Sequence, residues 1–120
     1  MAGPILIVDD DITVRATMAR ILQDEGYTVV EAADGIDALA ALDGLLPGLI
    51  LLDMTLPRMD GRAFVAELER LGLRSRMPIV VVTADGRAQE KAVEVGADDY
   101  LLKPFEVEGL LDVVTRRQAR

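Results

Sequence analysis

The chain has 120 residues, of which 51% are hydrophobic and only 3% aromatic, and its formal net charge is -8. This length predicts one domain, spanning residues 1–120, with a largely aliphatic core. The acidic balance argues against direct binding to nucleic acid or to an anionic membrane, because both need a basic face. It suits a protein partner with a basic surface, or a site that holds a cation.

The residue types that the chain lacks narrow its chemistry. It has no cysteine and no histidine, which excludes disulfides, zinc–thiolate sites and catalysis by imidazole. A bound metal needs oxygen ligands, which points to Mg²⁺, Mn²⁺ or Ca²⁺. We find neither a secretory leader at residues 1–4 nor an apolar stretch long enough to span a bilayer, so we expect a soluble, cytoplasmic protein.

Short apolar runs alternate with apolar stripes at helical spacing along the chain. The runs predict strands at 4–8, 27–31, 49–52, 78–82 and 99–102, because short continuous apolar runs are typical of strands buried on both faces. The stripes predict helices whose inward residues span 14–22, 36–40, 64–71, 88–95 and 107–114. Asp11 is the expected N-cap of the first helix. Five strands alternating with five helices predict an α/β fold, a doubly wound parallel sheet with helices on both faces.

Four of the five predicted strands end in a reactive polar side chain: Asp9 with Asp10, Asp53, Thr83 and Lys103. Open parallel sheets bind their ligands outside the carboxyl ends of the strands. In the strand order 2-1-3-4-5, which is common among such sheets, these four ends lie side by side and the second strand is at the edge. The sequence therefore predicts one site that contains all five residues.

The chemistry of this predicted site follows from its charges. Three carboxylates close together raise one another's pKa, and a hard divalent cation relieves their repulsion. Formal charges of -3 from Asp9, Asp10 and Asp53, +2 from Mg²⁺ and +1 from Lys103 cancel. Asp53 is then a candidate nucleophile toward a phosphoryl group, with Lys103 and the Thr83 hydroxyl as ligands of phosphoryl oxygens.

Each of these residues also has an ordinary structural explanation. Asp9 and Asp10 fit a solvated helix start, while Asp53 and Thr83 fit turns at strand ends. Lys103 fits an exposed surface position. The chain has only two lysines against eleven arginines, however, which favours a selected role for a lysine at 103.

Four segments of the chain together resemble the receiver domain of two-component response regulators, of the chemotaxis-regulator type. They are Ile-Val-Asp-Asp-Asp at 7–11, Leu-Leu-Asp-Met-Thr-Leu-Pro-Arg-Met-Asp-Gly at 51–61, Val-Thr-Ala at 82–84 and Gly-Ala-Asp-Asp-Tyr-Leu-Leu-Lys-Pro-Phe at 96–105. The resemblance covers essentially the whole chain. It implies a flavodoxin-like (βα)5 fold with strand order 2-1-3-4-5. It also implies that Asp53 accepts a phosphoryl group from a sensor histidine kinase or a histidine phosphotransfer protein.

The resemblance further implies a set of metal ligands. Asp10, Asp53 and the backbone carbonyl of Thr55 match the Mg²⁺ ligands of the family, and Asp9 matches an acid that usually reaches the metal through water. Asp85 and Thr55 match positions that tune autodephosphorylation.

The remaining matches concern the phosphoryl group and the switch. Lys103 matches the lysine that binds the phosphoryl group, and its peptide bond to Pro104 is implied to be cis. Thr83 and Tyr100 match the switch pair, in which the hydroxyl turns toward the phosphoryl group and the ring moves between outward and inward positions. The interval from Thr83 to Lys103 is slightly shorter than in many members, which predicts a trimmed fourth helix or a trimmed loop before it.

The leading hypothesis is a phosphorylation-controlled switch that acts by contact with a downstream protein target. Such a protein catalyses only its own phosphorylation and dephosphorylation, so we do not expect an enzyme in the usual sense. We expect a monomer or weak dimer, without direct binding to nucleic acid or membrane.

Three alternatives remain open. A Mg²⁺-dependent phosphohydrolase with an aspartyl nucleophile usually needs a second acid just after the nucleophile, where this chain has Met54 and Thr55. A flavin-binding module needs a loop rich in Ser, Thr and Gly after the first strand, where this chain has three aspartates. A pseudo-receiver would bind partners without phosphate.

Overall fold

The computed structural model describes residues 3–84 and 86–118. Its five strands form one parallel sheet in the order β2-β1-β3-β4-β5. The strands are β1 (Ile5–Val8), β2 (Val29–Ala32), β3 (Leu49–Asp53), β4 (Ile79–Thr83) and β5 (Asp99–Leu102). The predicted flavodoxin-like α/β fold and its strand order are confirmed.

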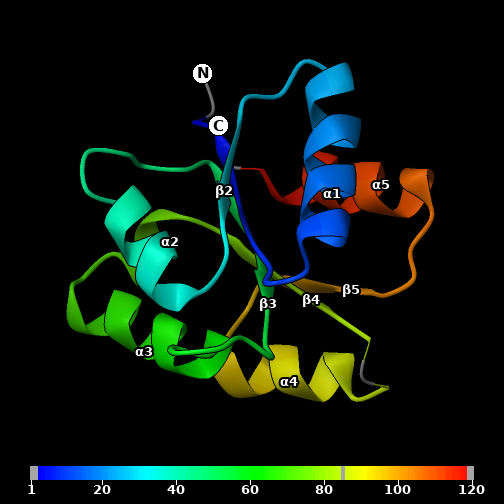
Figure 1. The fold of residues 1–120 in the computed structure, drawn as a ribbon. Helices are drawn as coiled ribbons and strands as arrows, with labels where there is room; N and C mark the ends of the chain where they lie inside the picture. Colours follow the sequence, from blue (N-terminus) through cyan, green and yellow to red (C-terminus); the bar gives the residue numbers. More distant parts are fainter. Residues whose placement is uncertain (1–2, 85, 119–120) are drawn as a thin grey trace.

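Helices cover both faces of this sheet (Figure 1). One face carries the first and last helices, and the other face carries the three between them. The helices are α1 (Ile12–Asp24), α2 (Gly35–Ala41), α3 (Gly61–Arg70), α4 (Ala88–Val95) and α5 (Val107–Arg117), with a 3-10 turn η1 (Arg74–Arg76). None of the described helices has the length and apolar character that a membrane span requires.

The core consists of two apolar layers separated by the sheet. Ile50 and Leu52 of β3 pack with residues of α2, α3 and α4, whereas Leu49 and Leu51 pack with residues of α1 and α5. All four side chains are buried. Because successive strand residues point to opposite faces and both faces are covered, the strand must be apolar at every position. This burial fixes Asp53 at the point where β3 leaves the core.

Aspartates begin the first three helices. The side chain of Asp11 accepts hydrogen bonds from the backbone N–H groups of Thr13 and Val14, which confirms the predicted N-cap of α1. Asp34 and Asp60 cap α2 and α3 in the same way. These caps set where each helix starts, and the cap at Asp11 fixes the direction in which the chain leaves β1 and enters α1 beside the site.

The structure corrects four inward assignments, one of which is Val107, 48% exposed at the first position of α5. Ile36 and Ala40 are exposed, whereas Gly35 and Ala38 are the buried residues of α2, because the cap at Asp34 sets the rotation of this short helix. Leu71 is 48% exposed because it lies at the C-cap of α3, where the helical stripe has ended. The second strand begins at Val29 instead of 27, and η1 was not predicted.

Candidate functional site

The carboxyl ends of β1, β3 and β4 and the turn after β5 surround one hollow of about 330 Å³. All five residues predicted from the strand ends line it. The full lining consists of Asp9, Asp10, Asp11, Asp53, Thr55, Thr83, Ala84, Lys91 and Lys103. Thus a single site collects the polar ends of four segments that lie far apart in the chain.

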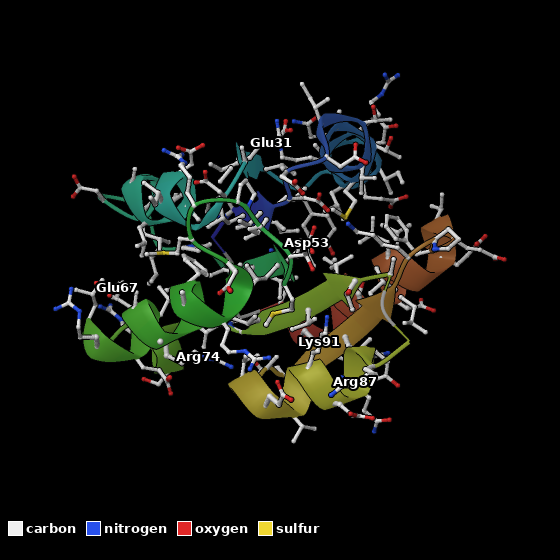
Figure 2. All side chains as sticks on the ribbon, turned by 60° about the horizontal axis from the view of Figure 1, so that its bottom comes forward. Glu31, Asp53, Glu67, Arg74, Arg87 and Lys91 are labelled. Carbon is white, nitrogen blue, oxygen red and sulfur yellow. The ribbon has the colours of Figure 1, made fainter. Side chains whose placement is uncertain are left out.

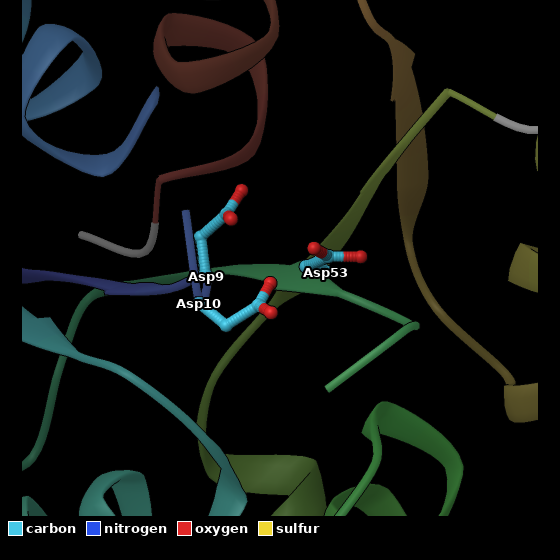
Figure 3. Close-up of side chains that lie close together, drawn as sticks. All are labelled: Asp9, Asp10 and Asp53. Atoms are coloured by element: carbon cyan, nitrogen blue, oxygen red, sulfur yellow. The ribbon is translucent and has the colours of Figure 1, made fainter. Parts of the chain in front are cut away.

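Three carboxylates form the acidic part of this site. Asp9 and Asp10 follow the end of β1, and Asp53 is the last residue of the neighbouring strand β3 (Figure 3). One carboxylate oxygen from each lies within 4.8 Å of the other two. Asp9 is fully buried and Asp53 is 7% exposed, whereas Asp10 is exposed. The cluster is therefore anchored in the core and open to solvent on one side.

Lys103 bridges two of these carboxylates. Its Nζ lies 2.7 Å from Asp9 Oδ2 and 3.4 Å from Asp53 Oδ2. Its backbone N–H donates to the carbonyl of Thr83 at 2.9 Å, which joins the turn after β5 to the end of β4. The Lys103–Pro104 peptide bond is cis. These contacts hold the ammonium group over the acidic cluster.

Burial and charge perturb both partners of this bridge. Burial raises the pKa of Asp53, and the nearby charge of Asp9 raises it further, against the opposing effects of the Thr55 N–H and Lys103. Burial alone would lower the pKa of Lys103, but the carboxylates of Asp9 and Asp53 outweigh it, so its pKa is raised. Lys103 therefore stays charged at neutral pH, and Asp53 carries its negative charge at a free-energy cost.

The donor set fits a hard divalent cation. Three carboxylates and one ammonium group leave a formal charge of -2 (-3 from Asp9, Asp10 and Asp53, +1 from Lys103), which one Mg²⁺ neutralises. The ligand atoms are all oxygens, as Mg²⁺ and Mn²⁺ prefer. Thr55 borders the same hollow, and its backbone N–H donates to Asp53 Oδ1 at 2.9 Å. That its carbonyl binds the metal stays a prediction.

The two residues of the predicted switch pair lie on neighbouring strands in different surroundings. Thr83 is buried at the end of β4 and lines the hollow. Tyr100 is 36% exposed and is not among the described residues that line the hollow. It pairs in register with Val81, two residues before Thr83. Tyr100 is thus partly exposed and lies outside the hollow.

Lys91 was missed from the sequence. It lies on α4 (Figure 2) and its side chain borders the hollow. A signal was present, because the scarcity of lysine that singled out Lys103 applies equally to Lys91. Spacing along the sequence did not reveal Lys91, because α4 comes close to the carboxyl ends of the strands only when the chain is folded. Asp85, which the resemblance also singled out, lies outside the described residues.

Arg15 of α1 was also not predicted from the sequence as a site residue, and it holds the backbone next to the acidic cluster. A terminal guanidinium nitrogen donates to the carbonyl of Asp9 at 2.7 Å, and its Nε donates to Glu31 at 3.1 Å. The side chain is 15% exposed. It therefore fixes the backbone between β1 and α1, just before Asp10.

A second, mostly apolar hollow of about 370 Å³ adjoins the acidic one. It lies between α1 and the turn after β5, and the two hollows share Ala84 and Lys103. Its lining consists of Thr13, Val14, Thr17, Ala84, Lys103, Pro104 and Phe105. The approach to the carboxylates is thus bordered by a mostly apolar surface.

Known proteins are similar to this chain in sequence and in fold. The model of the response regulator receiver domain matches residues 5–115. Response regulator MprA of Mycobacterium ulcerans is 42% identical over 113 residues, which cover 92% of this chain and 48% of that protein. The DNA-binding dual master transcriptional regulator RpaA of Synechocystis is 41% identical over 109 residues, which cover 89% of this chain and 45% of that protein. The chain spans about half the length of these curated relatives.

Solved structures agree with these sequence relatives. Chemotaxis protein CheY4 of Vibrio cholerae is 34% identical with a TM-score of 0.88, over 98% of this chain and 99% of that one. The receiver domain of NtrX from Brucella abortus is 35% identical with a TM-score of 0.85, over 93% of this chain and 95% of that one. Together with the family match over most of its length, these likenesses show that the chain belongs to the response regulator receiver domain family.

Proposed function

We propose that Asp53 is the phosphoacceptor of a two-component phosphorelay, supplied by a sensor histidine kinase or a histidine phosphotransfer protein. The observation that carries this proposal is the position of the Asp53 carboxylate, close to the carboxylates of Asp9 and Asp10 and 3.4 Å from the ammonium group of Lys103. An Asp53 oxygen forms a bond to phosphorus while the bond from phosphorus to the donor's imidazole nitrogen breaks. The released imidazole keeps the electron pair of that bond and takes up a proton, and Asp53 becomes an acyl phosphate.

The surrounding residues supply positioning and charge. Lys103 is close enough to Asp53 to bind an oxygen of the incoming phosphoryl group, and the Thr83 hydroxyl donates to another. Asp9, Asp10, Asp53 and the Thr55 carbonyl would hold the metal. Bound Mg²⁺, or Mn²⁺ in its place, would stabilise the charge on the transferred phosphoryl oxygens.

A charge count supports this arrangement. In the phosphorylated site the charges are -2 from Asp9 and Asp10, -2 from the phosphoryl group, +2 from the metal and +1 from Lys103. The sum is -1, so the product is nearly balanced. A phosphohydrolase is less well supported, because the residue after Asp53 is the buried Met54 and not an acid.

The proposed output is a change in protein contacts. Phosphorylation would draw the Thr83 hydroxyl toward the phosphoryl group and shift Tyr100 from its partly exposed position, which biases a pre-existing alternative state. The partners are then a phosphodonor protein, for which the apolar hollow beside Lys103 is a suitable surface, and a downstream protein target. The chain would act in the cytoplasm, as a monomer or weak dimer.

Two absences belong to the same proposal. RpaA is named as DNA-binding, but a net charge of -8 disfavours direct nucleic-acid binding by the 120 residues of this chain, and it equally disfavours an anionic membrane. We propose no turnover of an external substrate: the chain would catalyse only its own phosphorylation and dephosphorylation.

The phosphoacceptor is tested by measuring intact mass after incubation with acetyl phosphate, with and without Mg²⁺. We expect the native protein to gain one phosphoryl group only when Mg²⁺ is present, and Asp53→Asn to gain none. Asp43→Asn, which changes an exposed aspartate outside the described lining of the site, should behave like the native protein. No gain in any condition would instead support a pseudo-receiver that binds its partners without phosphate.

A further inference from the structure

Arg58 ties the loop between β3 and α3 to the start of α2. Its Nε lies 2.5 Å from Asp34 Oδ2, and a terminal nitrogen lies 3.1 Å from Asp37 Oδ1. The Asp34 carboxylate is buried, with 4% of the side chain exposed, while 54% of the Arg58 side chain is exposed. A buried carboxylate needs such a partner, and the hydrogen bond from Arg58 accordingly lowers the pKa of Asp34.

Backbone contacts also hold this loop in place, in addition to the side chain of Arg58. Arg58 has φ +58, a left-handed conformation that strongly favours glycine, so the side-chain contacts must offset the strain of placing arginine there. The next residue, Met59, accepts a hydrogen bond through its carbonyl from the Gly35 N–H at 3.2 Å. A Cβ at Gly35 would meet that carbonyl oxygen at 2.8 Å, so only glycine allows so close an approach.

The other end of the loop enters the acidic site. Thr55 donates its N–H to Asp53 Oδ1 and borders the hollow. The Gly61 N–H donates to the Met54 carbonyl at 3.3 Å and closes the base of the loop. Only two residues separate Thr55 from the anchored Arg58. A movement of the backbone at Arg58 should therefore shift Thr55 within the site.

We propose that Arg58 and Asp34 form a positioning pair, which holds the loop 54–60 so that Thr55 directs its backbone carbonyl to Mg²⁺ and its N–H to Asp53. The inference rests on the proposed function, because Mg²⁺ at this site belongs to that proposal. Arg58 is not among the described residues that line the hollow, so its role is indirect. The β2–α2 corner, which sequence analysis left outside the site, then supplies the anchor for one of its walls.

The direction in which Mg²⁺ affinity changes when Arg58 is removed distinguishes a positioning role from a purely electrostatic one. Removing Arg58 takes away a positive charge and leaves Asp34 without its cationic partner. If charge alone matters, this loss of one positive charge should strengthen the attraction of a divalent cation. Loss of positioning should weaken Mg²⁺ binding instead, because Thr55 would no longer be held in place.

The test is the Mg²⁺ affinity of Arg58→Gly, measured by titration calorimetry at constant ionic strength. Glycine adopts the left-handed conformation without strain, so this variant removes the contacts without adding backbone strain. We expect binding about tenfold weaker, at the low end of the losses seen when groups behind metal ligands are removed. Amide exchange at Thr55 should become faster in the same variant.

Two further variants complete the design. Arg62→Ala also removes one positive charge, but Arg62 pairs with Glu94 at 2.5 Å and so joins α3 to α4; its Mg²⁺ affinity should be unchanged or slightly higher. Asp34→Asn keeps a side chain that caps α2, and it should weaken Mg²⁺ binding much as Arg58→Gly does. Combining it with Arg58→Gly should add little, because the two residues act as one pair.

Affinity equal to or tighter than that of the native protein, in Arg58→Gly or in Asp34→Asn, would overturn the inference. Arg58→Asn, which removes the same positive charge and also tolerates the left-handed conformation, carries the test if Arg58→Gly does not fold. Asp34→Asn cannot replace it, because losing a negative charge weakens Mg²⁺ binding by electrostatics alone. If the native protein is phosphorylated at Asp53 and binds Mg²⁺, such a result removes only the positioning pair. If the native protein binds no Mg²⁺, the metal-dependent proposal and the inference both fail.

Discussion

At the scale of single residues, the site is a cluster of charges that is not balanced by protein groups alone. Asp9 and Asp53 are buried, Asp10 is exposed, and Lys103 contacts only the first two. The raised pKa of Asp53 records the free energy needed to keep this carboxylate ionised away from water. A bound cation would offset the negative charge of this site, so the free energy of unfolding should depend on whether a cation is present.

The first consequence is a gain in stability when Asp53 is neutralised. A folded-state pKa above the usual 3.8 means that protonation of Asp53 favours the fold below that value, and this contribution is lost as the pH rises through the folded pKa. Without Mg²⁺ at neutral pH, Asp53→Asn should therefore raise the free energy of unfolding by about 1 kcal/mol. Urea unfolding measures it, and the gain should shrink in acid.

Addition of Mg²⁺ supplies the control for this prediction. A ligand that binds only the folded state stabilises it, so Mg²⁺ should raise the unfolding free energy of the native protein more than that of Asp53→Asn. A variant less stable than the native protein at neutral pH without Mg²⁺ would show that Asp53 is not held at a cost.

At the scale of elements, an ionic contact joins the start of β5 to the end of α5. Asp99 Oδ2 accepts hydrogen bonds from Arg116 at 2.8 Å and from Arg117 at 3.1 Å. The two arginines lie in the last turn of α5, where positive charge also complements the helix dipole. Because β5 is at the end of the strand order, this contact secures a strand that has a single neighbour in the described sheet.

We expect Asp99→Asn to loosen this junction. Burial acts to raise the pKa of Asp99, but the hydrogen bonds from Arg116, Arg117 and the Tyr100 N–H outweigh it and lower the pKa. The stabilisation is therefore present above the usual value of 3.8 and is lost as the pH falls through the folded pKa. The variant should lose about 0.5–1 kcal/mol at neutral pH, because both arginines are largely solvated.

Urea unfolding and amide exchange at the end of α5 check this prediction. Asp112→Asn, an exposed position on the same helix, serves as the control and should change neither. A difference between Asp99→Asn and the native protein that persists unchanged in acid would contradict the ionic explanation.

The same elements show what the sequence could and could not predict. Buried parallel strands need apolar residues at every position, so the strands and their polar ends at Asp53 and Thr83 were readable. The 3-10 turn η1 was not, because Arg74 is held by the Gly96 carbonyl and by Asp98, which lie 22 and 24 residues away. The role of Arg58 could not be predicted from the sequence for the same reason, since its partner Asp34 belongs to another loop.

At the scale of the whole molecule, the sheet places the proposed phosphoacceptor and the proposed switch on adjoining strands. Phosphorylation at the end of β3 would act on Thr83 at the end of β4, and β4 pairs directly with β5, which carries Tyr100. The helices α4 and α5 flank β5 in sequence and contact it. A change at the carboxyl end of β3 would therefore have a short path to the surface formed by these elements.

This arrangement predicts where the protein should change on phosphorylation. Amide exchange in α4, β5 and α5 should change by about fivefold or more, the lower limit of usual coupling free energies, while α2 stays constant. Hydrogen-exchange mass spectrometry with and without acetyl phosphate measures it. Thr83→Ala should still gain the phosphoryl group but show a smaller change. Unaltered exchange in the phosphorylated native protein would mean that no switch operates.

The bridge between Lys103 and Asp9 joins residues that are 94 positions apart in the chain. During synthesis, which proceeds from the amino terminus, the ribosome makes Asp9, Asp10 and Asp53 long before Lys103. A nascent chain that ends before β5 carries the three carboxylates without that ammonium group, and its sheet has no strand to bring the group to them. The complete charge arrangement around Asp53 therefore exists only after β5 and Lys103 have been translated, so a chain that stops before them cannot assemble it.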